Sequence, residues 1–280
     1  MIEPVPALPA DLSPDVARWL EMAEARAYGD AYAAVGELPG NPLGASTAVI
    51  GGGIAHALTI LEFFFFNRVV GLGVEQPATR ADVTAAAAFF HNLGLTQTAI
   101  HVAPGVQPPE LPMWLAAEGY KQGGRWVKVW HDLKDVAAPS AALRIERIGP
   151  ESATTFGEVC LAAFEMPDAV GALVTATVGR PGWSHYLGFD GDEPVSVAAL
   201  RVDGGVAWLG YGGTLESHRG RGWQTAMLLR RLRDARSAGC RLAITETGEE
   251  TEKDPVNHSY RNMIRTGFRL GYARRNWYTE

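Results

Sequence analysis

The sequence is poor in cysteine, in net positive charge and in long uninterrupted apolar runs. Its 280 residues include 2 cysteines, Cys160 and Cys240, without CxxC spacing, which argues against a disulfide framework or a structural zinc site. The formal net charge is −6, so we expect no general affinity for nucleic acid or anionic membranes. The hydrophobic fraction of 47% is instead typical of a globular protein with well-filled cores.

No secretory signal and no membrane span are expected. Residues 1–14 are rich in proline and acids and lack a basic region, so we expect a cytoplasmic protein with buried, reduced thiols. The most apolar stretch, 49–66, is interrupted by His56, Thr59 and Glu62 and carries three glycines at 51–53, which favours two buried strands. Its four phenylalanines at 63–66 fit either a core or interdomain position or an apolar substrate wall.

The apolar spacing predicts two α/β halves joined by a linker at 136–142, with one domain over 1–135 and another over 143–280. In the first half we expect helices over 15–35, 80–92 and 109–117, and strands over 45–60, 68–75, 98–102 and 125–130. In the second half we expect helices over 151–163, 168–178, 224–238 and 257–266, and strands over 143–148, 184–189, 195–202, 206–214, 241–247 and 272–278.

The two halves share short motifs in the same order. Gly71-Leu72-Gly73 followed by Arg80 corresponds to Gly210-Tyr211-Gly212 followed by Arg219, which indicates a duplicated domain. After Arg80 the first copy has no glycine in the turn and carries Asp82, which would repel a phosphate. We therefore expect that only the second copy binds an anion.

The run from Arg219 to Ala226 lies between an apolar segment, 207–214, and a helical one, 224–238. This pattern predicts a strand, a glycine turn and a helix start, which together point free backbone N–H groups at a phosphate. Gly220 and Gly222 allow a close approach of the ligand, and Arg219 and Arg221 add positive charge at the positive end of the helix. The sequence therefore predicts a pyrophosphate site.

This order, continued by a strand and by a helix that ends at Gly267-Phe268, resembles the GNAT superfamily of acyl-CoA-dependent N-acyltransferases. The resemblance covers 143–280 well and the whole chain as a tandem GNAT protein with a degenerate first copy. It implies an α/β (α+β) fold with two GNAT-like domains, each a mixed, mostly antiparallel sheet flanked by helices. The family signature Gln/Arg-x-x-Gly-x-Gly/Ala is matched by Arg219 and Gly222, but Gln224 stands where a tiny side chain is usual.

The resemblance implies acetyl-CoA as co-substrate, with the pantetheine arm between two splayed strands and the pyrophosphate at the glycine turn. The donor-binding residues that it implies are Thr214, Leu215, Glu216, Arg219, Gly220, Arg221, Gly222, Trp223, Gln224, Thr225, Asn257 and Met263. Asn257 fits a helix cap equally well, and Trp223 fits a packing role. No metal is expected, because His185, His218 and His258 lack metal-ligand spacing.

Amine acylation needs a base for the ammonium and an acid for the departing thiolate. Glu246, at the end of its strand, is the expected base, and Glu216 is a second carboxylate at a strand end. The resemblance places a tyrosine acid four residues before Gly267, where this chain has Met263. Tyr260 and Ser259 are the hydroxyls left as candidates for the acid.

We therefore expect an enzyme that moves an acetyl or other short acyl group from acyl-CoA to an amine of a small molecule or peptide. Met263 and Gln224 leave open a non-catalytic acyl-CoA-binding sensor or interaction module. A transferase that uses aminoacyl-tRNA is a further alternative, against which the acidic net charge speaks. No nucleic acid or membrane partner is expected.

Overall fold

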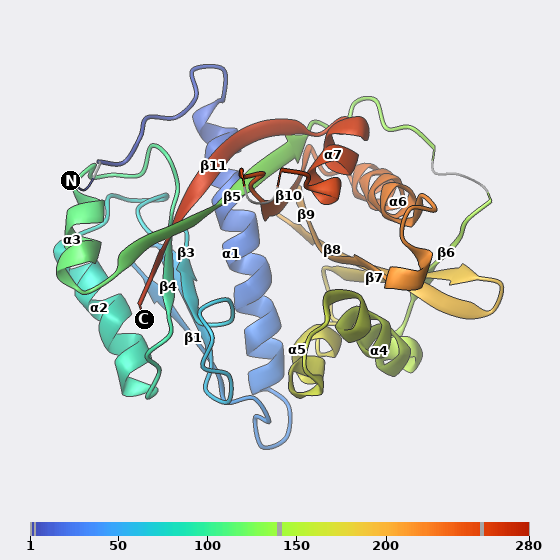
Figure 1. Ribbon diagram of the computed structural model, residues 1–280, viewed down its shortest axis with the longest axis horizontal. Helices are drawn as coiled ribbons and strands as arrows, with labels where there is room; N and C mark the ends of the chain where they lie inside the picture. The colour runs from blue at the N-terminus through green and yellow to red at the C-terminus, as the bar shows by residue number, and fades with distance from the viewer. Residues whose placement is uncertain (1, 3, 139–141, 253–254, 280) are drawn as a thin grey trace. The chain divides into compact units, whose positions relative to one another are not determined.

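The structure, a computed structural model, describes residues 2, 4–138, 142–252 and 255–279 (Figure 1). Contacts within the chain divide it into unit 1 (Met1–Lys128, Glu246–Glu249 and Gly271–Glu280) and unit 2 (Val129–Thr245 and Glu250–Leu270). The two units are described separately below. Residues 139–141 of the expected linker lie outside the described residues, and the domain boundary at 136–142 stays a prediction.

Unit 1 contains a mixed sheet with the strand order β1-β2-β3-β4-β11-β5. Its strands are β1 (Ala45–Ile50), β2 (Gly53–Leu58), β3 (Arg68–Val70), β4 (Ala99–Val102), β5 (Lys121–His131) and β11 (Arg269–Tyr278). β1, β2 and β3 are antiparallel, β3 and β4 are parallel, and β4 and β11 are antiparallel. The C-terminal strand β11 thus pairs with a strand from the first half of the chain.

The helices of unit 1 lie where the sequence predicts them, although the third begins two residues later than expected. They are α1 (Pro14–Gly36), α2 (Arg80–Asn92) and α3 (Leu111–Ala117). The Ser13 hydroxyl accepts a hydrogen bond from the Val16 N–H at 3.3 Å, and Pro14 occupies the first turn, which confirms the expected start of α1. α1 runs along the sheet and packs on β1, β2 and β3 (Figure 1).

Two strands meet in the apolar stretch 49–66: β1 ends at Ile50 and β2 follows a turn in which Gly51 and Gly52 have φ of 54° and 79°. β2 is buried as expected, whereas β1 is partly exposed, with Val49 at 77%, so the expectation of two buried strands is wrong for β1. β2 ends at Leu58, so the four phenylalanines lie in a loop of unit 1. Phe66 is buried, whereas the exposed fraction of Phe63 is 44%. The ring centroids of Phe64 and Tyr278 are 4.3 Å apart, so this run is partly core and partly surface.

Unit 2 contains the strand order β10-β9-β8-β7-β6. Its strands are β6 (Arg144–Ile148), β7 (Trp183–Asp190), β8 (Glu193–Asp203), β9 (Val206–Thr214) and β10 (Leu242–Gly248), the last of which continues into unit 1 from Glu246 on. Neighbours from β6 to β9 are antiparallel, and β9 and β10 are parallel. These strands confirm those expected over 143–148, 184–189, 195–202, 206–214 and 241–247, whereas the strand expected over 272–278 is β11 in the sheet of unit 1.

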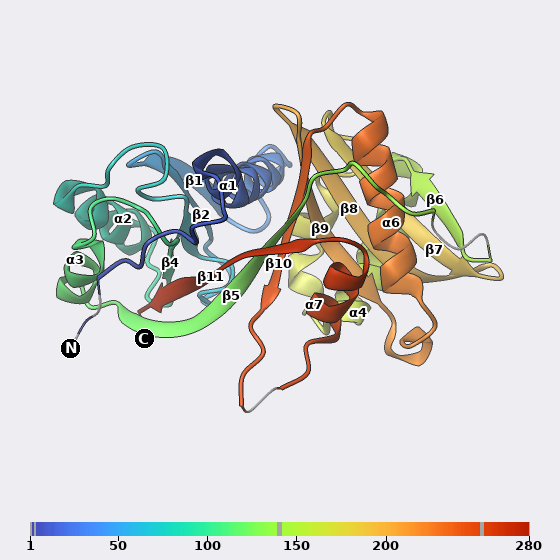
Figure 2. The same cartoon turned by 90° about the horizontal axis from the view of Figure 1, so that it is seen from above.

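Helices cover both faces of the unit 2 sheet. They are α4 (Ala153–Phe164), α5 (Gly171–Thr175), α6 (Trp223–Ser237) and α7 (His258–Arg265). α4 and α6 both pack on β8 (Figure 2), and residues 195–200 of β8 are buried at every position. Because successive side chains of a strand point to opposite faces, the two helices lie on opposite sides of the sheet. No helix in the described part of the chain is long and apolar enough to cross a membrane.

Candidate functional site

The turn between β9 and α6 has the backbone form that the sequence predicts. Gly220 and Gly222 have φ of 78° and 88°, in the left-handed region that favours glycine. Gly222 is the N-cap residue of α6 and has no side chain with which to cap the helix. The N–H groups of the first turn of α6 therefore point toward the turn without a side-chain acceptor from the cap, as an anion site requires.

The two arginines of the turn hold its shape. Arg219 donates to the carbonyl oxygens of Thr214 at 3.4 Å and Ala163 at 3.2 Å. Arg221 donates to an oxygen of the Asp190 carboxylate at 3.1 Å and to the Ser217 carbonyl at 3.3 Å. Both guanidinium groups thus tie the turn to neighbouring segments, and Asp190 offsets part of the charge of Arg221.

β9 carries an irregularity just before this turn. Val197 is paired with Gly213 and Ala199 with Gly210, so one residue of β8 lies opposite Tyr211 and Gly212. This is a β-bulge, and Tyr211 takes the rare positive φ of 50° within it. The parallel pairing of β9 with β10 covers 206–208 and 242–244, and the bulge lies beyond these pairs.

The residues expected to contact the pantetheine arm differ in their hydrogen bonds and in their burial. The Leu215 N–H already donates to the Val195 carbonyl at 2.9 Å, and the Leu215 carbonyl accepts from the His218 N–H. Thr214 and Glu216 lie at the end of β9 and in the following 3-10 helix, Glu216–His218. Trp223 is buried, and a Cβ at Gly188 would meet its indole at 2.9 Å, so this side chain packs the start of α6.

Gln224 lies in the first turn of α6, and its hydrogen bonds show why a large side chain fits where the family signature has a tiny one. Its Nε2 donates to the Ser259 Oγ at 2.8 Å, and its Oε1 accepts from the Asn262 Nδ2 at 2.6 Å. The long side chain therefore lies against α7. Asn257 caps α7, since its Oδ1 accepts from the Tyr260 N–H at 3.0 Å.

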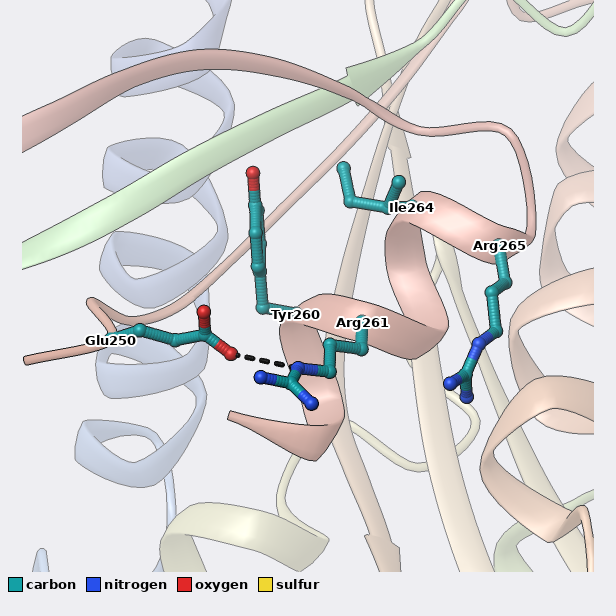
Figure 3. Close-up of a pocket in the computed structure, with 5 residues that line it drawn as sticks. All are labelled: Glu250, Tyr260, Arg261, Ile264 and Arg265. Carbon is teal, nitrogen blue, oxygen red and sulfur yellow. Dashed lines mark hydrogen bonds and ion pairs between the residues drawn. The ribbon is translucent and has the colours of Figure 1, made fainter. Parts of the chain in front are cut away.

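α7 presents a shallow hollow lined by Glu250, Tyr260, Arg261, Ile264 and Arg265 (Figure 3). Glu250 and Arg261 form an ion pair of 3.0 Å. The Tyr260 side chain extends away from α7, so that its hydroxyl is the part farthest from the helix (Figure 3). Met263, at the position of the usual acid, is buried. Tyr260 and Ser259 thus remain the candidate hydroxyls of this helix, although Ser259 is bonded to Gln224.

Glu246, the expected base, lies in a cluster of buried charges within unit 1. Its Oε2 accepts from the Lys128 Nζ at 2.9 Å and from the Arg274 Nη2 at 3.1 Å. Both cations also bind Glu24, and Arg274 binds Glu21 at 2.9 Å. Burial, and then the nearby Glu24, raise the pKa of Glu246. Although burial opposes it, the cations Arg274, Lys128 and Arg68 hold the pKa of Glu24 well below its usual range.

The helix of unit 1 that corresponds to α6 has a different start. Thr79 and Asp82 form a capping box at the N-terminus of α2, with the Asp82 Oδ2 accepting from the Thr79 N–H at 2.8 Å. The Thr79 hydroxyl in turn accepts from the Asp82 N–H at 3.2 Å, so side-chain oxygens already occupy part of the place that an anion would take. Within residues 4–138, 142–252 and 255–279, no three His, Cys, Asp or Glu side chains form a group that could hold a metal ion.

Arg231 is a residue near the site that the sequence patterns did not single out. It lies on α6 with an exposed fraction of 3%, and it donates to the Ala199 and Gly210 carbonyls beside the bulge. Its spacing from Trp223 and Met227 places it on the buried stripe of the helix. A charged residue on such a stripe is the signal by which the sequence would have revealed it.

Solved structures of similar architecture cover almost the whole chain. A GCN5-related N-acetyltransferase from Kribbella flavida shares 18% identity and a TM-score of 0.64, covering 97% of this chain and 96% of that chain. A tandem GNAT protein from the clavulanic acid biosynthesis pathway shares 19% identity and a TM-score of 0.59, covering 100% of this chain and 98% of that chain. A GCN5-related N-acetyltransferase from Sphaerobacter thermophilus shares 15% identity and a TM-score of 0.58, covering 98% and 94%.

No family model matches the sequence, and no curated protein matches it. At 15 to 19% identity, the similarity to the solved structures concerns the fold. It confirms the expected α/β architecture and the resemblance on which that expectation rested. The chain has the fold of the GNAT acetyltransferases, in its tandem form.

Proposed function

We propose that this protein transfers an acyl group, acetyl in the first instance, from acyl-CoA to an amine of a small molecule or peptide. The observation that carries this proposal is the start of α6, where Gly220 and Gly222 take positive φ and no side chain caps the helix. A pyrophosphate is the anion that suits such a helix start after a strand. The fold similarity to GNAT acetyltransferases supports acyl transfer in general.

The bulge in β9 fits the second requirement, a place for the reacting carbonyl. Peptide groups turned out of the regular ladder can donate to an oxygen that becomes negative during the reaction. Along the chain, the bulge at Tyr211 and Gly212 comes first and the glycine turn at Gly220 and Gly222 comes second. In acyl-CoA, the thioester and the pyrophosphate follow each other in the same order. Thr214 and Glu216, which lie between these two points along the chain, and Thr225, in the first turn of α6, are proposed as further contacts of the donor.

For the proton transfers, we propose Tyr260 of unit 2 as the acid, and Glu246 stays the base that the sequence predicts. Burial and Glu24 raise the pKa of Glu246, which brings a carboxylate closer to the range useful for a base near neutral pH. Its Oε1 is buried and has no hydrogen-bond partner among the described residues. The Tyr260 hydroxyl can supply the proton that the departing thiolate needs, because a CoA thiolate is only moderately basic and a weak acid is sufficient to protonate it.

A turnover assay tests this function. The protein would be incubated with acetyl-CoA and a broad panel of amines while free thiol is measured. We expect thiol release above background for a subset of amines, with the acetylated amine identified by mass spectrometry. Absence of release across the panel, in a preparation that binds acetyl-CoA, would contradict the enzymatic proposal.

A second candidate is a non-catalytic acyl-CoA sensor, and one observation favours it. Met263 is buried, with an exposed fraction of 5%, at the place where the family resemblance puts an acid. Binding of acetyl-CoA without turnover of any amine would support the sensor.

A further inference from the structure

Arg231 is a buried cation in the middle of unit 2. Its Nε donates to the Met227 carbonyl at 3.1 Å, and its Nη1 donates to the Ala199 carbonyl at 3.1 Å and the Gly210 carbonyl at 3.0 Å. One guanidinium group thus joins α6 to β8 and β9. The acceptors are all backbone oxygens.

No described carboxylate forms an ion pair with Arg231. Burial lowers the pKa of Arg231 to about 10, although the nearby Tyr186 opposes this shift. The side chain therefore remains charged at neutral pH. A buried charge without a counter-ion is costly, and carbonyl dipoles are the groups that compensate it here.

The guanidinium group lies directly at the bulge in β9. Gly210 and Ala199 face each other at the edge of the bulge, and both carbonyls point at Nη1. A peptide group is planar, with its C=O and N–H on opposite sides, so fixing the Gly210 carbonyl also fixes the N–H of Tyr211. Arg231 thereby sets the orientation of the peptide group on which the positive φ of Tyr211 depends.

Gly212 shows how closely the cation approaches the strand. A Cβ built at Gly212 would lie 3.1 Å from the Arg231 Nη2, which is tighter than ordinary contact. Any larger residue at this position would push the guanidinium group away from the bulge. The position of the buried Arg231 guanidinium group therefore depends on the absence of a side chain at Gly212.

We propose that Arg231 is a positioning residue for the acyl carbonyl: it holds the bulge peptides in place so that their N–H groups can polarise the thioester C=O. This inference rests on the proposed function, because it takes the bulge as the place of that carbonyl. N–H dipoles that are fixed in place before the reaction stabilise negative charge that develops on the carbonyl oxygen, because they need no reorientation. Arg231 acts through the backbone.

Equilibrium binding of two donor analogues tests the proposal without knowledge of the acceptor. Acetyl-CoA has the carbonyl, whereas S-ethyl-CoA carries a CH2 group in its place. We expect wild type to bind acetyl-CoA about 2- to 10-fold more tightly than S-ethyl-CoA, the range of one hydrogen bond. In Arg231→Met the ratio of the two Kd values falls to about 1, while the Kd for S-ethyl-CoA stays within about 2-fold. Arg231→Lys, which keeps the charge, recovers part of the ratio.

Infrared spectroscopy gives an independent readout. With acetyl-CoA labelled with carbon-13 at the carbonyl, we expect the C=O stretch to shift to lower frequency on binding wild type, and this shift to be lost in Arg231→Met. Arg233→Met serves as the matched control, because Arg233 is an exposed residue of the same helix. It should behave as wild type in both experiments.

The outcomes separate the two proposals. If wild type binds neither analogue, the proposed function fails and this inference fails with it. If wild type prefers acetyl-CoA and folded Arg231→Met keeps both the ratio and the frequency shift, the inference alone is overturned. Should Arg231→Met not fold, Gly212→Ala takes its place: it displaces the guanidinium group without removing the charge and should lower the ratio. An unchanged ratio in Gly212→Ala would then overturn the inference.

Discussion

The Gln224 Nε2 lies 2.8 Å from the Ser259 Oγ, and this hydrogen bond connects the first turn of α6 to α7. The Gln224 Oε1 completes the connection by accepting from Asn262. The amide of Gln224 is thus occupied by α7, which allows a large side chain at a position where the family signature has a tiny one. This relationship makes the residue a structural link between two helices.

Gln224→Ala removes both hydrogen bonds of this link. We expect the free energy of unfolding to fall by about 1 to 2 kcal/mol, since each such bond contributes about 1 kcal/mol. The Kd for acetyl-CoA should change by less than about 3-fold, because the side chain is directed at α7. Urea denaturation and calorimetry measure the two quantities. A tenfold loss of affinity with unchanged stability would show that the amide contacts the donor instead.

Thr79→Ala tests whether unit 1 takes part in donor binding. The variant loses the cap of α2, which costs about 0.5 to 2 kcal/mol of stability. We expect one acetyl-CoA bound per chain in wild type and in the variant, with equal Kd. A stoichiometry of two, measured by calorimetry, would contradict the assignment of donor binding to unit 2 alone.

The buried charge cluster gives stability a pH dependence that variants can resolve. Because the folded-state pKa of Glu246 is raised above the ordinary value of 4.5, its stabilising share is complete below pH 4.5 and is lost as pH rises through the folded pKa. Glu246→Gln, a mimic of the protonated acid, should therefore gain stability relative to wild type as pH increases from 4.5 toward 8. Urea denaturation along this series checks the sign, and a relative loss with rising pH would contradict it.

Glu24 has the opposite behaviour. Its pKa is lowered in the fold, so its stabilising share is present above the ordinary value of 4.5 and is lost as pH falls through the folded pKa. Glu24→Gln leaves Arg274 and Lys128 with less compensating charge, and we expect a loss of about 3 to 5 kcal/mol at pH 7. The loss should shrink as the pH is lowered below 4.5. A deficit independent of pH would argue against the ion pairs as its source.

Tyr260→Phe tests the proposed acid. The Tyr260 hydroxyl has no hydrogen-bond partner in the described part of the chain, so the unfolding free energy should stay within about 0.5 kcal/mol of wild type. With an amine that the wild-type protein acetylates, we expect kcat to fall by about 10²-fold or more. Ser259→Ala is the comparison variant. If it lowers kcat while Tyr260→Phe does not, the acid is Ser259.

Local signals made much of the fold predictable. Ser13 and Pro14 mark the start of α1, and Gly220 and Gly222 mark the turn before α6, because the residues that fix these features are adjacent in sequence. β3 was expected over 68–75 but ends at Val70. Gly71 and Gly73, with φ of 85° and 77°, end the strand, and a pattern of apolar residues alone does not reveal such angles.

The residues that were harder to predict depend on partners far away in the chain. The sequence around Glu246 is typical of a solvated strand end, yet Lys128 and Arg274 form ion pairs with Glu246 in the interior of unit 1. Arg231 stands in a run of arginines that is typical of an exposed helix face, yet it is buried and donates hydrogen bonds to carbonyls of β8 and β9. The burial of Glu246 depends on tertiary contacts that no local spacing encodes. For Arg231, the helical spacing from Met227 signals the buried face, but the carbonyl acceptors come from distant strands.

Calorimetric titration with acetyl-CoA tests the central claim, that the start of α6 binds the donor's pyrophosphate. Gly222→Asp places a carboxylate at the N-terminus of α6, and Gly239→Asp places one just beyond the other end, where the glycine also has positive φ, 77°. Both variants carry similar backbone strain of about 1 to 2 kcal/mol, so their comparison isolates the charge. We expect one site in wild type, a loss of affinity of at least about tenfold in Gly222→Asp, and wild-type affinity in Gly239→Asp. Absence of binding to wild type, or equal affinity in all three proteins, would contradict the account.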